Sequence, residues 1–463
     1  MSESPVRPAE SDRPARTGGQ RLGWLDALRG IAALAVVFQH LGPDLLPSAE
    51  AAVDRRMDLG IFGVMLFFLV SGYIVPASLE RRHDVRGFWI GRIFRIYPLY
   101  LAVIVAAVVL LPRQFPGVQS VVFHEPVLSA VGNGTLLQFV TGVPNALAVA
   151  WTLSFEMVFY YFVSTLFVLG LHRRSAPIAV GFAALALVSG VLSGNLLTRS
   201  VSDTHLLTAV VTLLVVVALG GILSGRTVLV RAGALLLGCT GLVLILVNSR
   251  SSGFETMMIF AMMFSGTVLY RAEHGQIKPW TAVASCCFVV VAAVGSSYRY
   301  GHGKALSLTW AHSWHSWCVA VLMAWLFFGT AMLLRRRRFP AALPWLGKVS
   351  YATYLIHLPL AAAMYWLFSA TKYHPHGQAQ GAACMLGFLA VLLAVSYAAH
   401  RLVELPGQKL GRNLLRRWPG PSTDAAVLAG GHSQDLEQRP TGAEPTAEPL
   451  LAASTTGEAE QDR

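Results

Sequence analysis

The strongest constraint on the fold of this chain is its series of long apolar runs. A helix that crosses the hydrocarbon core of a bilayer needs about 20 mostly apolar residues. Twelve such segments lie at 25–43, 59–79, 97–112, 150–171, 177–195, 205–224, 229–247, 254–270, 279–296, 313–334, 349–369 and 380–401. Because these runs are continuous and do not alternate, they predict spanning helices and exclude a β-barrel. We expect an all-α polytopic membrane protein with about 10–12 transmembrane helices, of which 97–112 is the shortest.

Composition supports this fold class. Of the 463 residues, 54% are hydrophobic and only 13% are charged, against about 25% charged in an average soluble domain. These values exclude a disordered protein and argue against an ordinary soluble enzyme. The five cysteines lie in apolar stretches without metal-type spacing, so we expect neither a disulfide framework nor a metal site.

The net charge of +12 is unevenly distributed. The tail from Pro419 carries −6 and residues 1–22 carry +1, which leaves +17 on the apolar body. Lys and Arg gather in every second loop, which predicts a cell-membrane protein with both termini in the cytoplasm. A second interpretation of the excess is an anionic ligand. The chain has no basic soluble face of the kind that binds nucleic acid, so we expect no nucleic-acid partner.

Both ends of the chain are polar. Residues 1–22 lack the apolar stretch of a cleavable signal peptide and are expected to be a disordered cytoplasmic N-terminus. Residues 23–410 form the predicted membrane domain. Residues 411–463 are predicted to be a disordered acidic cytoplasmic tail, because so few apolar residues cannot bury enough area to fold.

Ionisable side chains inside spanning helices are candidates for function, because burying them in a bilayer costs a few kcal/mol. Arg29 and His40 are eleven residues apart, which places them on one helix face about 16 Å apart along the axis. Taken singly, Arg29 could extend to the inner surface and His40 could lie at the outer interface. Glu156 falls about a turn and a half below the outer surface, at the predicted level of His40, and needs a partner.

Two further segments carry candidate residues. Residues 86–98 are basic, aromatic and amphipathic, which predicts an interfacial helix with Arg92 and Arg95 on one side. These arginines suit phosphate oxygens, but a helix lying on anionic headgroups needs the same residues. Ser350, Tyr351 and His357 follow in a later apolar run, where a packed histidine is as reasonable as a catalytic one. The chain has no Walker A loop, no His-Glu-x-x-His helix and no Gly-x-Ser-x-Gly elbow.

Five motifs in order give the chain a resemblance to the integral-membrane acyltransferase 3 family over roughly residues 21–410. They are Leu25 to Ala33 with His40, Gly63 to Ile74, Arg92 to Pro98, Trp151 to Glu156, and Ser350 to His357. The chain departs from the family in having Trp151-Thr152-Leu153 where Trp-Ser-Leu is common. It also resembles a stand-alone member, without the SGNH esterase-like domain that some members carry.

The resemblance implies an acyl-CoA-dependent O-acyltransferase. Such an enzyme moves an acyl group to a hydroxyl of a sugar-containing acceptor, such as a polysaccharide, a lipid-linked glycan or a natural product. His40 is then the catalytic base, Arg29 its family partner, and Arg92 and Arg95, with Arg29, face the donor. Acetyl-CoA is the expected donor substrate, and no bound cofactor is expected.

Physical reasoning adds roles for the remaining candidates. Glu156 is expected to orient His40 or to stabilise its imidazolium, as a carboxylate does in a triad. Ser350, Tyr351 and His357 are assigned to the substrate or to the structure.

Two other classes remain open at this stage. Arg29, His40 and Glu156 could line the path of a proton-coupled secondary transporter or flippase, although the inverted repeats typical of transporters are not found. A structural subunit without chemistry is the third class, and ionisable residues on one helix face argue weakly against it.

Overall fold

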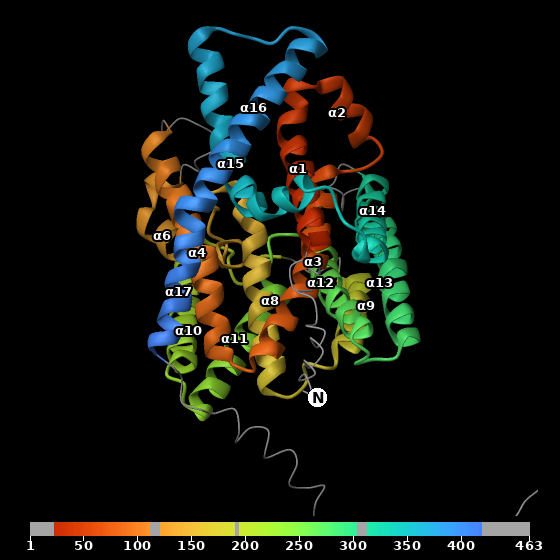
Figure 1. Ribbon diagram of the computed structural model, residues 1–463. Helices are drawn as coiled ribbons and strands as arrows, with labels where there is room; N and C mark the ends of the chain where they lie inside the picture. The colour runs from red at the N-terminus through yellow and green to blue at the C-terminus, as the bar shows by residue number, and fades with distance from the viewer. Residues whose placement is uncertain (1–22, 112–120, 190–193, 303–312, 419–463) are drawn as a thin grey trace, which may run out of the picture. The chain divides into compact units, whose positions relative to one another are not determined.

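A computed structural model describes residues 23–111, 121–189, 194–302 and 313–418, and every regular element in these ranges is helical (Figure 1). The elements are α1 (Gly23–Leu45), α2 (Pro47–Asp54), α3 (Leu59–Arg82), α4 (Val85–Leu110), α5 (Val121–His124), α6 (Pro126–Gly134), α7 (Gln138–Thr141), η1 (Ala148–Ala150), α8 (Trp151–Val168), α9 (Ser175–Val188), α10 (Val201–Leu223), α11 (Thr227–Val247), α12 (Gly253–Glu273), α13 (Pro279–Tyr300), α14 (Trp314–Leu333), η4 (Leu334–Arg336), α15 (Ala342–Thr371), α16 (Gly377–Ala399), η5 (His400–Glu404) and α17 (Leu405–Arg417). The prediction of an all-α polytopic membrane protein is therefore confirmed.

Eleven helical segments in the described ranges are long and apolar enough to cross a membrane. The remaining apolar helix, α9, has only 14 residues. Ser189, at its end, lies against Gly253 at the start of α12, and the Leu187 carbonyl accepts a hydrogen bond from the Tyr300 hydroxyl at the end of α13. Because α9 thus runs antiparallel to α12 and parallel to α13, it crosses the bundle too. Counted with α9, twelve helical segments of the described residues run between the two ends of the bundle, and eleven of them are long and apolar enough to span a membrane. This agrees with the expected 10–12 helices.

The connections meet at two ends of the bundle. We call one the basic end, because it holds Arg81, Arg82, Arg173 and Arg174 and the arginines after α14. His83 contacts Phe167 there, and Arg335 contacts Glu273. Gly23 at the start of α1 lies close to Pro344, and the Trp418 ring lies beside Arg86. Both described termini therefore lie at the basic end. We call the opposite end, where α1 meets α2, the far end.

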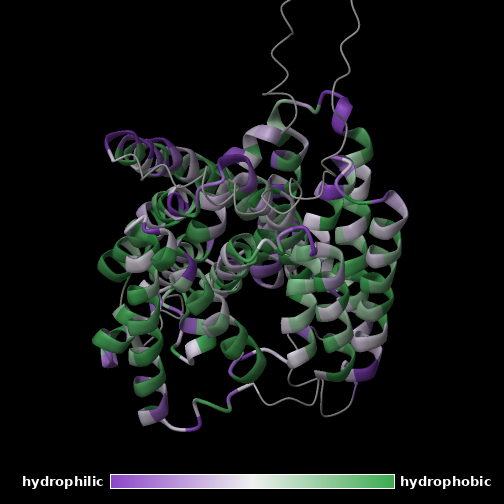
Figure 2. Ribbon diagram, turned by 90° about the horizontal axis from the view of Figure 1, so that it is seen from below, coloured by the Kyte–Doolittle hydropathy of each residue, from purple (hydrophilic) through white to green (hydrophobic). Residues whose placement is uncertain are grey.

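The peripheral helices expose apolar side chains along their length. On α10, Leu206, Leu213 and Val217 are 67%, 64% and 58% exposed. Figure 2 shows hydrophobic residues over most of the helices and hydrophilic residues concentrated in connections and at helix ends. Such surfaces are unfavourable in water and fit a lipid environment.

Two details differ from the sequence-based expectations. Residues 86–98 are not a separate interfacial helix, because they continue through Pro98 into the single helix α4. Gly407 packs against the Pro98 ring, so protein surrounds the position where the proline interrupts the hydrogen-bond ladder. Residues 411–417, expected in the disordered tail, belong to helix α17. The predicted N-terminal segment 1–22 and the rest of the tail lie outside the described residues.

Helices α1 and α15 form a close parallel pair. A Cβ atom at Gly347 would collide with the Asp26 carbonyl, and one at Gly30 would lie 2.7 Å from Leu346 Cβ. Small residues allow two membrane helices to approach this closely. His40 lies ten residues after Gly30, and His357 lies ten residues after Gly347. Equal spacing from one contact brings the two histidines to the same height.

Helices α3 and α12 form a second close parallel pair by the same means. A Cβ atom at Gly72 would collide with the Met263 carbonyl, and one at Gly266 with the Leu69 carbonyl. The Thr267 hydroxyl donates to the Gly72 carbonyl at 2.8 Å. This pair holds α3 rigidly where its other face borders the cavity described next.

Candidate active site

A cavity of about 70 Å³ lies between α1, α3, α8 and α15. Its walls divide by chemistry. One set is apolar and consists of Val64, Phe67, Phe68 and Leu153. The other set is polar and consists of Arg29, Ser71, Thr152, Glu156, Tyr351 and Tyr354. The volume suits a small group or several water molecules, but it is far below the several hundred Å³ of a site that encloses a whole nucleotide-sized ligand.

Arg29 and Glu156, both predicted site residues, face each other across this cavity. Arg29 also interacts electrostatically with Arg95, Asp26 and Glu404. The carboxylates of Asp26, Glu156 and Glu404 therefore offset the positive charges of Arg29 and Arg95, which explains how these charges are tolerated among spanning helices.

Glu156 connects the cavity to Arg92 through a tyrosine. The Tyr160 hydroxyl, one helical turn further along α8, donates a hydrogen bond to Glu156. The Arg92 guanidinium lies 5.1 Å from the centroid of the Tyr160 ring and 5.1 Å from that of Phe88. Its Nη2 donates to the Ser78 hydroxyl at 3.1 Å. Arg92 is thus held in a fixed orientation by polar and aromatic partners.

These contacts correct the headgroup interpretation of Arg92. Arg86 and Arg92 are each only 7% exposed, so neither lies free on a membrane surface. Protein groups from other helices cover the polar face of the predicted amphipathic helix. A helical wheel drawn for this segment alone cannot show them. Arg95 is half-buried and interacts electrostatically with Asp26 and Arg29.

The structure gives His40 a different partner from the one expected. Its Nδ1 lies 2.9 Å from the Val36 carbonyl and 3.3 Å from Nε2 of His357. His357 is fully buried, whereas the His40 side chain is exposed.

Glu156 was expected at the level of His40, but it lies deeper in the bundle. Thr152, at the start of α8, hydrogen-bonds at 2.9 Å to Tyr354, one turn before His357. Glu156 is a further turn towards the basic end, about 10 Å from the His357 level. The reason is the segment before α8: Gln138, Val140 and Ala150 are fully buried, so this connection folds into the bundle. Helix α8 therefore begins below the far end.

Ser350 and Tyr351 separate into two roles. The Ser350 hydroxyl is buried and donates to the Gly347 carbonyl at 2.8 Å, which closes a local helical contact. Tyr351 lines the cavity, and its hydroxyl donates to the Ile96 carbonyl of α4 at 2.9 Å. Of this pair only Tyr351 can reach a molecule in the cavity.

Several lining or supporting residues were given no site role from the sequence. Ser71, Thr152 and Tyr354 all lie inside motifs used for the family resemblance, and their positions in those motifs were the available signal. Tyr160 could have been found from its spacing of four residues after Glu156, which places both on one helix face. Ser78 carries no comparable signal, because its contact with Arg92 joins two helices.

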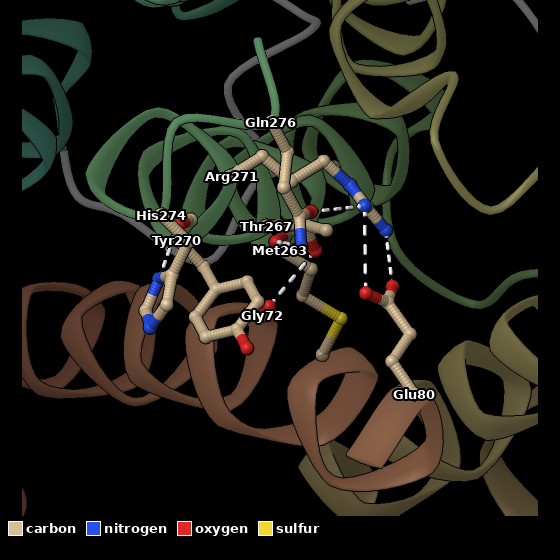
Figure 3. A network of polar contacts seen from close by, with 8 residues as sticks. All are labelled: Gly72, Glu80, Met263, Thr267, Tyr270, Arg271, His274 and Gln276. Carbon is tan, nitrogen blue, oxygen red and sulfur yellow. Dashed lines mark hydrogen bonds and ion pairs between the residues drawn. The ribbon is translucent and has the colours of Figure 1, made fainter. Parts of the chain in front are cut away.

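A second polar cluster lies outside the cavity, near the basic end (Figure 3). Arg271 forms an ion pair with Glu80, and its Nη1 donates to Gln276 at 2.7 Å. The Arg271 side chain has no exposed surface. This cluster joins α3 to α12 and neutralises itself. Among the described residues, no group of three His, Cys, Asp or Glu side chains is arranged to hold a metal ion.

The fold and the cavity together define a class: a polytopic membrane protein with a charged cavity between its helices. Residues 22–401 match the family profile described as Acyltransferase domain, so the chain belongs to the acyltransferase 3 family of integral-membrane acyltransferases. The resemblance drawn from the motifs is confirmed. No solved structure matches this chain.

Curated relatives match over shorter stretches. Acyltransferase MdmB of Streptomyces mycarofaciens is 31% identical over 154 residues, which cover 30% of this chain and 38% of that protein. YrhL of Bacillus subtilis (strain 168), provisionally named a peptidoglycan O-acetyltransferase, is 26% identical over 193 residues. That match covers 36% of this chain and 27% of YrhL. The chain thus spans well under half the length of either relative.

Proposed function

We propose that this protein is an acyl-CoA-dependent O-acyltransferase of the cell membrane, acting on the hydroxyl of a sugar-containing acceptor. The observation that carries the proposal is the cavity lined by Arg29 and Glu156, which lies deeper in the bundle than the exposed His40. Membership of the acyltransferase family supports group transfer over the proton-coupled transporter or flippase alternative.

Acyl-CoA enters this proposal as the donor substrate, held by arginines. Its phosphates carry several negative charges, and guanidinium forks match phosphate oxygens. Arg92 and Arg95 lie on the part of α4 that begins at the basic end, and Arg29, which interacts with Arg95, lines the cavity. With both termini in the cytoplasm, the basic end faces the acyl-CoA pool. The cavity volume favours acetyl over longer acyl groups, because only the thioester end of the donor enters it.

The proposed reaction uses His40 as general base. The acceptor oxygen attacks the thioester carbonyl while its proton passes to Nε2 of His40, and a carbon–oxygen bond replaces the carbon–sulfur bond. The leaving CoA thiolate then takes the proton from the imidazolium. Arg29 holds the donor in the cavity. Glu156 balances the charge of Arg29, in place of the earlier expectation that it orients His40.

The proposed class of acceptor is inferred from the names of related proteins. YrhL is provisionally named for peptidoglycan, a glycan polymer, and O-acetyltransferases recur among the curated matches, such as SACOL0978 of Staphylococcus aureus (strain COL), also provisionally named. A hydroxylated glycan or glycosylated metabolite therefore remains the proposed acceptor.

Thiol release from acetyl-CoA tests the proposal. The purified chain in lipid nanodiscs is incubated with acetyl-CoA and a pooled extract of envelope glycans and secreted metabolites, as wild type and as His40→Ala. We expect release that requires both the extract and His40, at a rate at least about 100-fold above that of the variant. A folded His40→Ala protein with wild-type activity contradicts the base assignment. Absence of both thiol release and acetyl-CoA binding contradicts the donor and favours transport.

A further inference from the structure

The contact between His40 and His357 has a defined geometry. The two ring centroids are 5.1 Å apart, and the rings are tilted by 47°. Nε2 of His357 points at Nδ1 of His40 across 3.3 Å. The helix register described above fixes this arrangement, because both histidines follow the Gly30–Gly347 contact by ten residues.

Backbone carbonyls determine which ring nitrogens carry hydrogen. A carbonyl oxygen only accepts, so Nδ1 of His40 must be the donor to Val36 at 2.9 Å. Nδ1 of His357 is the donor to Thr353 at 3.3 Å for the same reason. In the neutral rings, the lone pair of each histidine therefore lies on Nε2. The His357 lone pair faces the same Nδ1–H of His40, so this hydrogen is shared in a three-centre bond between the Val36 carbonyl and Nε2 of His357. The His40 lone pair on Nε2 is left free.

Burial separates the two rings further. His357 is fully buried, and the neighbouring Tyr354 is fastened to the Val149 carbonyl at 3.0 Å and to Thr152 at 2.9 Å. His40 is exposed on the same pair of helices. A rigid buried acceptor next to an accessible base is the arrangement in which a second group sets the direction of the first.

We propose that His357 is a positioning residue that accepts a hydrogen bond from Nδ1–H of His40 and so directs the lone pair on Nε2 of His40 towards the acceptor hydroxyl. The inference rests on the proposed function, in which His40 is the base. When His40 takes the hydroxyl proton, positive charge grows on its ring, and the His357 lone pair stabilises it. No proton passes to His357. A neutral imidazole thereby takes the part that a carboxylate takes in a catalytic triad.

Two substitutions of His357 separate positioning from packing. His357→Phe keeps a ring of similar size and removes the acceptor, whereas His357→Gln keeps an acceptor on a smaller side chain. We expect His357→Phe to lower kcat for thiol release from acetyl-CoA about 10-fold or more, with the KM for acetyl-CoA unchanged. We expect His357→Gln to recover part of that loss. Thermal unfolding in the same nanodiscs checks that both variants are folded.

Nitrogen NMR supplies a readout that needs no acceptor. In ¹⁵N-histidine-labelled wild type in nanodiscs, the signals lost in His40→Ala should show the Nδ1–H form. In His357→Phe, the same signals should shift towards a mixture of the two neutral forms. An unshifted His40 signal together with unchanged kcat overturns the inference.

Equal losses of kcat in His357→Phe and His357→Gln also overturn the inference, because they indicate packing alone. These outcomes differ from failure of the proposed function. If His40→Ala itself retains wild-type activity, the proposed base falls. If His40→Ala is inactive but both His357 variants keep wild-type activity, His40 remains the proposed base and the positioning role of His357 is contradicted.

Discussion

Two pairs of helices are joined in the same way but position different kinds of polar group. In both α1–α15 and α3–α12, parallel helices meet where a glycine leaves no room for a side chain. In α3–α12, Glu80 follows Gly72 by eight residues and Arg271 follows Met263 by eight, so the contact also sets the ion pair. In α1–α15, the contact sets two histidines. Close packing alone therefore does not distinguish a functional region from a structural one.

The difference lies in how much open space borders the polar groups. Arg271 has no exposed side-chain surface and is bonded to Glu80 and Gln276 (Figure 3). Its buried Nε has no hydrogen-bond partner among the described residues, and the pocket beside it measures only about 10 Å³. Arg29 instead borders a cavity, and His40 keeps a free nitrogen on an exposed ring. Charged groups that are packed without free space stabilise a fold, whereas charged groups beside open space are available to a ligand. The two helix pairs should accordingly respond to mutation in different measurements.

Breaking the ion pair of α3–α12 should have the largest effect on stability. Glu80→Leu leaves the buried Arg271 charge uncompensated, and we expect a loss of about 3–5 kcal/mol in the free energy of unfolding. The double variant Glu80→Leu/Arg271→Met should recover most of it. Denaturation in detergent measures both, and activity per folded molecule should stay at the wild-type value. Loss of activity in the folded double variant would show that Glu80 and Arg271 contribute to catalysis. It would contradict the contrast between the α3–α12 and α1–α15 helix pairs.

Widening the α1–α15 contact should affect both measurements. Gly347→Ala forces the helices apart at Asp26, with an expected loss of about 1–3 kcal/mol in stability. Because the histidines share that register, activity per folded molecule should fall as well. Gly233→Ala, where a Cβ atom would collide with the Ala218 carbonyl between α10 and α11, is the matched variant, with a similar stability loss and unchanged activity, because neither helix lines the cavity. Gly220→Ala, which meets no atom within 4 Å, controls for the substitution itself.

Removing Arg92, which we propose faces the donor, should weaken donor binding. Arg92→Gln removes a charge from the proposed phosphate site, and we expect the KM for acetyl-CoA to rise about 10-fold. Arg337→Gln, at an exposed position of the basic end, serves as control. An unchanged KM in Arg92→Gln would mean that Arg92 packs against Tyr160 but does not bind the donor.

The smallest expected effect is on the pH dependence of stability, through His172 near the Glu80–Arg271 ion pair. Burial lowers the pKa of His172, which lines a small pocket beside Arg271 and Glu80, from its ordinary value of 6.5. The unfolded chain therefore binds a proton more readily, and the wild type should lose stability as pH falls below about 6.5. His172→Phe should remove this component from a series of unfolding curves. Identical pH dependence in both proteins would contradict it.

The sequence was sufficient for the helices and for the family, because both depend on local patterns. Twelve apolar runs predicted the crossings, including the short α9, and the motif residues Arg29, Glu156 and Tyr351 do line one cavity. Relations between helices were not accessible in the same way. The pairing of His40 with His357 depends on the glycine contact that sets the helix register.

The misplacement of Glu156 has a similar physical origin. Its depth was estimated from its distance to the end of an apolar run, as if the preceding connection lay at the surface. The buried segment around Gln138 and Val140 invalidates that assumption. The sequence left the headgroup interpretation of Arg92 open beside the donor interpretation, because its partners Ser78 and Tyr160 come from other helices.

The shared ten-residue spacing also limits how such proteins can be recombined. Inserting one residue between Gly30 and His40 would rotate the imidazole by about 100° around α1, and no compensating change in a loop could restore it. Chimeras that exchange α1 with a relative should therefore tolerate loops of any length at either end. They should fail whenever the segment from glycine to histidine is longer or shorter in one helix than in the other.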